Sequence, residues 1–411
     1  MNRSWPDAVA ALLQKGVRMP NPGSMDIGDE VHPDRISADS VTLYPGCRIH
    51  GADTVICAGA QIGREGPATV EDCQVGPRVE LKGGYFQRAV FLEGSNLGLG
   101  AHVREGTILE EEASGAHCVG LKQTILFPFV TLGSLINFCD VLMAGGTSRR
   151  DHGEVGSSYV HFNFTPEGDK ATASMMGDVP RGVMLRQPPV FLGGQGGMVG
   201  PRRVAYGTVI AAGVVLREDI ERPDQLMLGH VPREGTRDRH PGRFSSIMRV
   251  TRNNMLYLAN LVALEEWYRH VRRLFFLRQK LGERVYAGAA GNLARAKTER
   301  LRRLEEMAEK AACSNAGDAP GSAGKRELRE AADALRELFS DAPAHGTEWR
   351  ERFLDRAMPG GDGAGYLKAI QALPEPTRED GVRWLQSVVD GLCVAAHQRM
   401  PSLNVFPQLV A

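Results

Sequence analysis

Aliphatic residues recur every six positions in the middle of this 411-residue chain. The clearest run is Leu192, Met198, Val204, Ile210 and Leu216. An α-helix would place apolar residues three and four apart, and a half-buried strand would place them two apart. A spacing of six instead predicts a parallel β-helix, in which each short strand supplies one inward aliphatic residue and three strands close one coil.

The repeat occupies residues 41–220, and the sequence differs on either side of it. Residues 1–40 combine a short amphipathic helix with a stretch containing proline and glycine, which we interpret as a cap over the first coil and a linker. Residues 245–411 have helical patterns and predict an α-helical C-terminal domain. Its first helix carries an apolar seam that would either join copies of the chain or pack onto its own domain: Tyr257, Leu261, Leu264, Tyr268, Val271 and Phe275.

Charge and cysteine content narrow the class of protein. Lys and Arg together number 49, as do Asp and Glu, so the net charge gives no reason to expect nucleic acid or an anionic membrane as a partner. The seven cysteines lie far apart, without the paired spacing of a zinc site, and no stretch has the length and apolarity of a membrane span. We therefore predict a cytoplasmic protein with reduced thiols, no metal site and no membrane contact.

The repeat is interrupted at residues 145–190, which we predict to form an inserted loop. Within it, GSSYVHFNFTPEGDKATASMMGDV (156–179) is too polar and irregular to continue the coils. Binding residues concentrate on loops that a rigid scaffold positions, so the sequence predicts a site here. The alternative is that Asn163 only makes a turn and that the neighbouring phenylalanines anchor the loop.

Basic residues and histidines are the candidate chemical groups of this stretch. Arg149 and Arg150, beside His152, suit a phosphate group, because guanidinium forks match phosphate oxygens. The alternative is a solvated turn in which neighbouring carboxylates neutralise both arginines. His161 is either a general base or a hydrogen-bonded core residue.

Residues 97–216 resemble the acetyltransferase half of the family of bifunctional N-acetylglucosamine-1-phosphate uridyltransferases and glucosamine-1-phosphate acetyltransferases. MVGPRRVAYGTVIAAGVVL looks like the final coils of that half, and HFNFTPEGDKAT stands where the family has a loop of the form N-Y-D-G followed by N-K. The chain also resembles bacterial hexapeptide-repeat proteins labelled UDP-N-acetylglucosamine pyrophosphorylases. The resemblance implies a left-handed β-helix, an exception to the usual right-handed crossover, and a homotrimer with sites between subunits.

The resemblance also implies roles for individual residues. Asn163 and Lys170 match loop residues that hold the sugar phosphate in the family, and Asn137 matches the asparagine that precedes the catalytic histidine. Phe138 stands in place of that histidine and cannot take a proton. The coils that border the pantetheine groove of coenzyme A in the family carry Gly193, Gly194, Gly196 and Gly197. Tight coil corners require glycine equally.

Three functions follow, in order of preference. The first is transfer of an acyl group from acetyl-CoA or another coenzyme A thioester to a sugar phosphate or nucleotide sugar, with His152 or His161 as the base. The residues that would orient the acceptor are Asn137, Asn163, Lys170, Arg149 and Arg150. The second is a non-catalytic protein that binds nucleotide sugars, or a scaffold, that has lost the family base. The third, nucleotidyl transfer of the UDP-N-acetylglucosamine pyrophosphorylase kind, is disfavoured because the sequence lacks a glycine-rich nucleotide loop and a paired acidic motif for metal.

Overall fold

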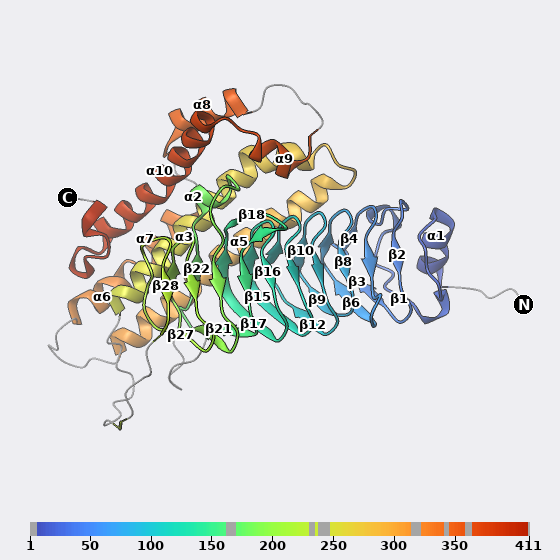
Figure 1. Ribbon diagram of the computed structural model, residues 1–411, viewed down its shortest axis with the longest axis horizontal. Helices are drawn as coiled ribbons and strands as arrows, with labels where there is room; N and C mark the ends of the chain where they lie inside the picture. Colours follow the sequence, from blue (N-terminus) through green and yellow to red (C-terminus); the bar gives the residue numbers. More distant parts are fainter. Residues whose placement is uncertain are drawn as a thin grey trace, which may run out of the picture.

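A computed structural model describes residues 6–161, 170–229, 235–236, 247–313, 322–340, 345–357 and 364–409. They form a long parallel β-helix of about eleven coils, with helices packed along one side of it (Figure 1). This architecture confirms the predicted fold, a left-handed parallel β-helix followed by an α-helical domain.

The β-helix has three faces, and most coils place one strand on each. The first face contains β1 (Asp26–Ile27), β3 (Arg48–His50), β6 (Ala68–Glu71), β9 (Gly84–Gln87), β12 (Ala101–Val103), β21 (Ser158–Val160), β24 (Gly196–Met198) and β27 (Val215–Leu216). The second face contains β4 (Val55–Ile56), β7 (Gln74–Val75), β10 (Ala89–Phe91), β13 (Thr107–Leu109), β22 (Ser174–Met176) and β25 (Arg203–Val204). Two longer strands turn the corner between these faces and belong to both: β15 (Val119–Leu126) and β17 (Ile136–Met143).

The third face is a ten-stranded parallel sheet. Its strands are β2 (Thr42–Leu43), β5 (Gln61–Ile62), β8 (Glu80–Leu81), β11 (Asn96–Leu97), β14 (Ser114–Gly115), β16 (Thr131–Leu132), β20 (Glu154–Val155), β23 (Phe191–Leu192), β26 (Val209–Ile210) and β28 (Leu226–Met227). Leu192 pairs with Ile210 on the next coil, eighteen residues on, which is three times the period of six. The aliphatic residues of the repeat point inward and are buried, so the repeat sets both the coil length and its core.

The N-terminal end of the β-helix is covered by α1 (Asp7–Lys15), which lies across the first coil in Figure 1. Val9 and Leu12 of this helix are fully buried. The Lys15 ammonium donates hydrogen bonds to the carbonyl oxygens of Pro33 and Ile36 at 2.6 and 2.8 Å. The helix therefore shields apolar side chains that an open first coil would leave in water.

The C-terminal domain consists of α3 (Ile247–Trp267), α4 (Arg273–Phe276), α5 (Gly282–Cys313), α6 (Ser322–Glu330), α7 (Ala332–Ser340), α8 (Thr347–Ala357), α9 (Tyr366–Gln371) and α10 (Glu375–Arg399). A π-helical turn, Tyr268–Arg272, joins α3 to α4. All six residues of the predicted apolar seam are buried within the single chain, so the seam packs inside this chain. Helix α5 contacts β7, β10 and β13 and thereby covers part of the second face. No helix in the described part of the chain is long and apolar enough to cross a membrane.

A buried charge cluster joins the helical domain to the β-helix. Arg272 is 1% exposed, and its Nη2 donates to both oxygens of Glu111 at 2.6 and 2.8 Å. Its Nη1 lies 3.6 Å from Glu110, which also accepts a 2.6 Å hydrogen bond from the Tyr268 hydroxyl. One guanidinium thus faces two carboxylates. Burial raises the pKa of Glu110 to about 7. The attraction of Arg272 lowers this pKa, and the repulsion of Glu111 raises it further.

Glu110 should make the stability of the protein depend on pH. The carboxyl titrates near 4.5 ordinarily and, by its pKa, near 7 in the folded chain, so between these values only the native state keeps the proton. The stabilisation of the native state by this proton is complete below pH 4.5 and is lost as the pH rises through 7. The loss in the free energy of unfolding is at most about 3 kcal/mol. Glu110→Gln should flatten the fall in the free energy of unfolding between pH 5 and 7, measured by urea titration. An unchanged slope in the variant would assign the titration to another group.

Candidate functional site

Residues 145–190 contain two separate departures from the coils, in place of the single inserted loop that the sequence predicts. The first is an antiparallel hairpin of β18 (Gly146–Ser148) and β19 (Asp151–His152), at the corner between the second and third faces. The second lies between β21 and β22, at the corner between the first and second faces. There, thirteen residues (161–173) stand where the preceding coil has two (139 and 140).

The hairpin contacts the coils and the helical domain. Arg149 Nη1 donates to the carbonyl oxygens of Glu112 and Phe129 at 3.0 and 3.1 Å, and to Thr131 Oγ1 at 2.9 Å. The side chain of Gln371, in α9, donates to the carbonyl oxygen of Thr147 at 2.6 Å. These contacts give Arg149 a structural use that does not depend on a ligand.

The other two candidates of the hairpin region have fewer contacts. Arg150 is exposed. His152 Nε2 lies 4.0 Å from a carboxylate oxygen of Glu154, and its buried Nδ1 has no hydrogen-bond partner among the described residues. In Figure 1, β18 lies at the edge of the β-helix next to the helices, and β17 and β21 lie at the opposite edge. The structure therefore does not bring this group together with Asn137, on the first-face part of β17.

The first face carries a column of outward side chains in register. Tyr85 pairs with His102, and the column continues through Gly120 and Asn137 to Tyr159. The Tyr85 and His102 rings lie 5.2 Å apart between centroids. Asn137 is exposed, and Tyr159 is 50% exposed. Since Gly120 has no side chain, the column has a gap between His102 and Asn137. A strip of aromatic and polar groups thus ends beside the second insertion.

His161 lies where the second insertion leaves the coil, with φ +86°. Its Nδ1 is hydrogen-bonded to the hydroxyl of Thr172, at the far end of the insertion, and lies 3.8 Å from Asp140 Oδ2. The Thr172 hydroxyl donates to the same Asp140 oxygen at 3.1 Å. The other oxygen of Asp140 pairs with Arg300 of α5 at 2.7 Å. The His161 side chain is 17% exposed, Asp140 9% and Arg300 3%, so the relay is screened from water.

The contacts of the relay are compatible with a proton on Nδ1 of His161. When the Thr172 hydroxyl gives its proton to Asp140, it accepts from His161, and Nδ1 is then the donor. A neutral ring that carries its proton on Nδ1 would have its lone pair on Nε2. The arrangement suits a general base, in which an acid orients the imidazole through a hydroxyl.

Neighbouring groups define the surroundings of His161. Lys170, two residues before Thr172, is exposed. The side chain of Asn254, in α3, donates to the carbonyl oxygen of Ala171 at 2.9 Å and holds the end of the insertion on the helical domain. Burial, and then the charge of Asp140, raise the pKa of the Cys139 thiol, so this cysteine is not activated as a nucleophile. Asn163 lies outside the described residues.

Phe138, which the resemblance matches to the catalytic histidine of the acetyltransferase family, is fully buried inside the coil. The four candidate glycines lie in one short stretch, the corner after β23 and the start of β24. A Cβ at Gly193 would lie 2.4 Å from the backbone nitrogen of Ala212, and one at Gly196 would lie 2.5 Å from the carbonyl oxygen of Val214. Contact between coils is therefore sufficient to require glycine at these two positions. Gly194 lies in the corner that follows Gly193, and Gly197 lies in the same strand as Gly196.

Two members of the relay were not predicted. Thr172 lies in a polar stretch without periodicity, and Arg300 lies on a helix more than a hundred residues further along the chain. Nothing in the sequence indicates that Arg300 meets Asp140, because the contact depends on how α5 packs on the second face. Among the residues that the structure describes, no group of three or more His, Cys, Asp or Glu side chains is placed to hold a metal ion.

Comparison with known proteins finds relatives over part of the chain. No protein-family model matches. The bifunctional protein GlmU of Trichlorobacter lovleyi is 25% identical over 222 residues, which cover 54% of this chain and 43% of that protein. GlmU of Thermotoga maritima is 26% identical over 222 residues, covering 54% and 44%. This chain thus spans less than half the length of these curated relatives. A solved UDP-N-acetylglucosamine acyltransferase from Campylobacter jejuni is 14% identical, with a TM-score of 0.23 over 51% of this chain and 70% of that one.

Proposed function

We propose that this chain, a hexapeptide-repeat β-helix protein, transfers an acyl group from a coenzyme A thioester to an amine or hydroxyl group of a sugar phosphate or nucleotide sugar. The observation that carries the proposal is the buried relay from His161 through Thr172 to Asp140. It prepares a base at the edge of an insertion, which is where the sequence predicts the acceptor to bind. The similarity to the GlmU proteins supports the class of donor and acceptor.

In this mechanism His161 moves one proton twice. As the acceptor nitrogen or oxygen bonds to the thioester carbonyl carbon, its proton passes to His161 Nε2. The C–S bond then breaks, and the imidazolium returns the proton to the departing thiolate to give free coenzyme A. Asp140 stabilises the imidazolium through Thr172 and holds the ring in place.

The remaining site residues would orient the acceptor. Lys170 is exposed at the end of the insertion and carries a charge that suits a phosphate group or a developing oxyanion. Asn137 offers an amide on the first face, and Asn163 is assigned from the family resemblance alone. The donor is likewise assigned from the resemblance, since the packing of Gly193 and Gly196 between coils explains these glycines without coenzyme A.

The test is loss of acyl transfer in His161→Asn. Asparagine tolerates positive φ and retains hydrogen-bonding capacity, so the fold should persist while the base is lost. We expect the rate of thiol release from acetyl-CoA, with a panel of sugar phosphates and nucleotide sugars, to fall about 10²- to 10⁴-fold. The matched control His152→Asn should keep the wild-type rate. Equal losses in both variants, or no thiol release by the wild-type protein with any acceptor, would contradict the proposal.

A second candidate function is a non-catalytic protein that binds nucleotide sugars. The observation in its favour is Phe138, whose burial leaves the family histidine position without a base. The two functions differ in their response to the donor. Thermal stabilisation by UDP-N-acetylglucosamine but not by acetyl-CoA would favour binding alone, because only a ligand that binds the native state raises its stability.

The homotrimer and the cytoplasmic location remain predictions. The third face offers one feature in support of assembly. Its outward column changes from polar in the first coils to apolar in the last, where Phe191, Val209 and Leu226 are 37%, 40% and 63% exposed. A contiguous exposed apolar strip of this kind is typical of an interface between protein chains.

A further inference from the structure

The turn that joins α4 to α5 exposes two leucines beside two arginines. Leu274 and Leu277 are 39% and 50% exposed, and Arg273 and Arg278 are exposed as well. Leu277 continues the helical backbone of α4, and successive residues of a helix are about 100° apart, so the four side chains cover an arc of about 140°. Their order around the helix is Arg273, Leu277, Leu274 and Arg278. The α4 tip, as we name these four residues, thus places two leucines between two positive charges.

Aromatic packing on the inner side fixes the direction of the α4 tip. Phe275 and Phe276 are buried. The Phe275 ring meets Tyr366 of α9 edge-on at 5.4 Å between centroids, and the Phe276 ring lies 6.0 Å from Tyr286 of α5. The Arg278 guanidinium lies over the Phe275 ring, 5.2 Å from its centroid. Because the phenylalanines occupy the inner side, the leucines of the tip are directed outward.

Basic side chains predominate around the α4 tip. Residues 273–284 contain one acid, Glu283, and four basic groups, which are Arg273, Arg278, Lys280 and Arg284. Lys280 is compensated by Asp39, whose carboxylate lies 3.7 Å away. In Figure 1 the turn before α5 lies beside α9, at the end of the helical domain nearest the N-terminal coils. The tip therefore combines an apolar pair with an excess of positive charge.

We propose that the α4 tip binds a membrane surface that contains anionic lipids. Leu274 and Leu277 would enter the apolar edge of the lipid layer, and the two arginines beside them would donate to lipid phosphates. Apolar side chains flanked by basic ones are typical of protein segments that lie in a membrane interface. The balanced net charge of the whole chain does not show this surface, because the excess is local. The inference concerns binding alone and does not depend on acyl transfer at His161.

The position of the α4 tip favours a lipid surface over an acidic protein. Its leucines lie at the turn between two helices and point outward, so they form a projection and not a groove. A lipid surface adapts to a projecting pair of leucines, whereas a protein partner needs a surface of matching shape.

Co-sedimentation with lipid vesicles tests the proposal. The two kinds of vesicle are phosphatidylcholine alone and phosphatidylcholine mixed with phosphatidylglycerol, at equal ionic strength. We expect the full chain to bind the mixed vesicles and to be released by NaCl, because salt screens the attraction between charges. One arginine near an anionic surface strengthens binding about fivefold, so Arg273→Gln combined with Arg278→Gln should weaken it about 25-fold. Leu274→Ser combined with Leu277→Ser should weaken it about tenfold, from the apolar area that no longer leaves water.

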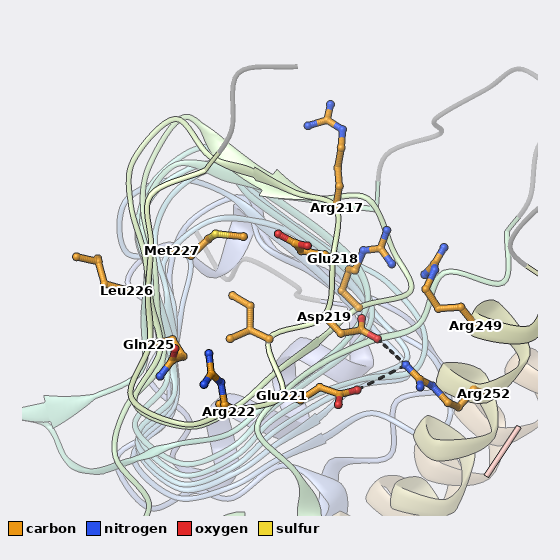
Figure 2. Close-up of a pocket in the computed structure, with 12 residues that line it drawn as sticks. Arg217, Glu218, Asp219, Glu221, Arg222, Gln225, Leu226, Met227, Arg249 and Arg252 are labelled. Atoms are coloured by element: carbon orange, nitrogen blue, oxygen red, sulfur yellow. Dashed lines mark hydrogen bonds and ion pairs between the residues drawn. The ribbon is translucent and has the colours of Figure 1, made fainter. Parts of the chain in front are cut away.

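The matched control removes the same charge from another part of the surface. Arg217 and Arg222 are exposed and line a cavity at the last coils of the β-helix, where Figure 2 shows them. Arg217→Gln combined with Arg222→Gln should bind the mixed vesicles as the wild type does. An equal loss in this control would mean that overall charge alone drives binding, and the assignment to the α4 tip would be wrong.

Tryptophan fluorescence of Leu277→Trp gives an independent readout of insertion. Its emission should shift to shorter wavelength on the mixed vesicles, and that of the wild type should not. This variant keeps the test valid if the arginine variant does not fold. The proposal is overturned if the wild type does not bind the mixed vesicles, if it binds both kinds equally, or if the arginine variant binds as the wild type does. Binding to polyglutamate in place of vesicles would assign the tip to an acidic protein segment and would equally overturn it.

Discussion

Replacing Arg272 by methionine is expected to lower the free energy of unfolding by about 3 to 5 kcal/mol. Methionine has a similar length and fills much of the same volume, so the principal loss is the charge. Glu111 would then be buried without the two hydrogen bonds that Arg272 donates to it. An unpaired buried carboxylate must either stay charged at a high cost or take up a proton. Urea unfolding at pH 7, followed by circular dichroism, measures the effect.

The matched control is Arg302→Met, on the exposed side of α5. Arg302 is 47% exposed and pairs with Glu299 and Glu306 on its own helix, so its loss should cost less than about 1 kcal/mol. Adding Glu111→Gln to Arg272→Met should recover part of the stability, because it removes the uncompensated charge. If Arg272→Met and Arg302→Met lower the free energy of unfolding equally, the cluster does not stabilise the contact between the β-helix and the helical domain.

The coils were predictable because their signal is local. Each inward residue from Leu192 to Leu216 lies six positions from the next, and the backbone of one coil fixes where the following coil pairs. The packing of the helical domain has no such signal. Nothing in the spacing of the acids at 110 and 111 indicates that they meet Arg272, because that contact forms only when α3 and α4 lie along the coils.

The candidate site, too, could be predicted from the sequence only in part. The sequence identifies the polar interruption and His161, because both break a regular pattern. It does not show which acceptors a side chain reaches in space. Arg149 has the residue type for a phosphate ligand but donates to coil carbonyl groups. Residue type and spacing therefore locate candidates, and three-dimensional packing assigns their use.

Placing a histidine at position 138 should reduce stability without creating a base. Phe138 is fully buried in the interior of the coil. Phe138→His would therefore bury an imidazole among apolar side chains. We expect the free energy of unfolding to fall by about 3 kcal/mol or more, from the lost apolar contacts and the unpaired ring nitrogens. Phe138→Leu, which stays apolar, should cost less than about 1.5 kcal/mol.

Acyl transfer by the same variant distinguishes the two candidate bases. If His161 is the base, Phe138→His should not raise the rate of thiol release, and it should not rescue His161→Asn when the two substitutions are combined. A rescued rate would mean that the side chain at position 138 reaches the acceptor, which its burial in β17 does not allow. A base at position 138 would then serve the reaction, and the relay through Thr172 to Asp140 would be a structural contact only.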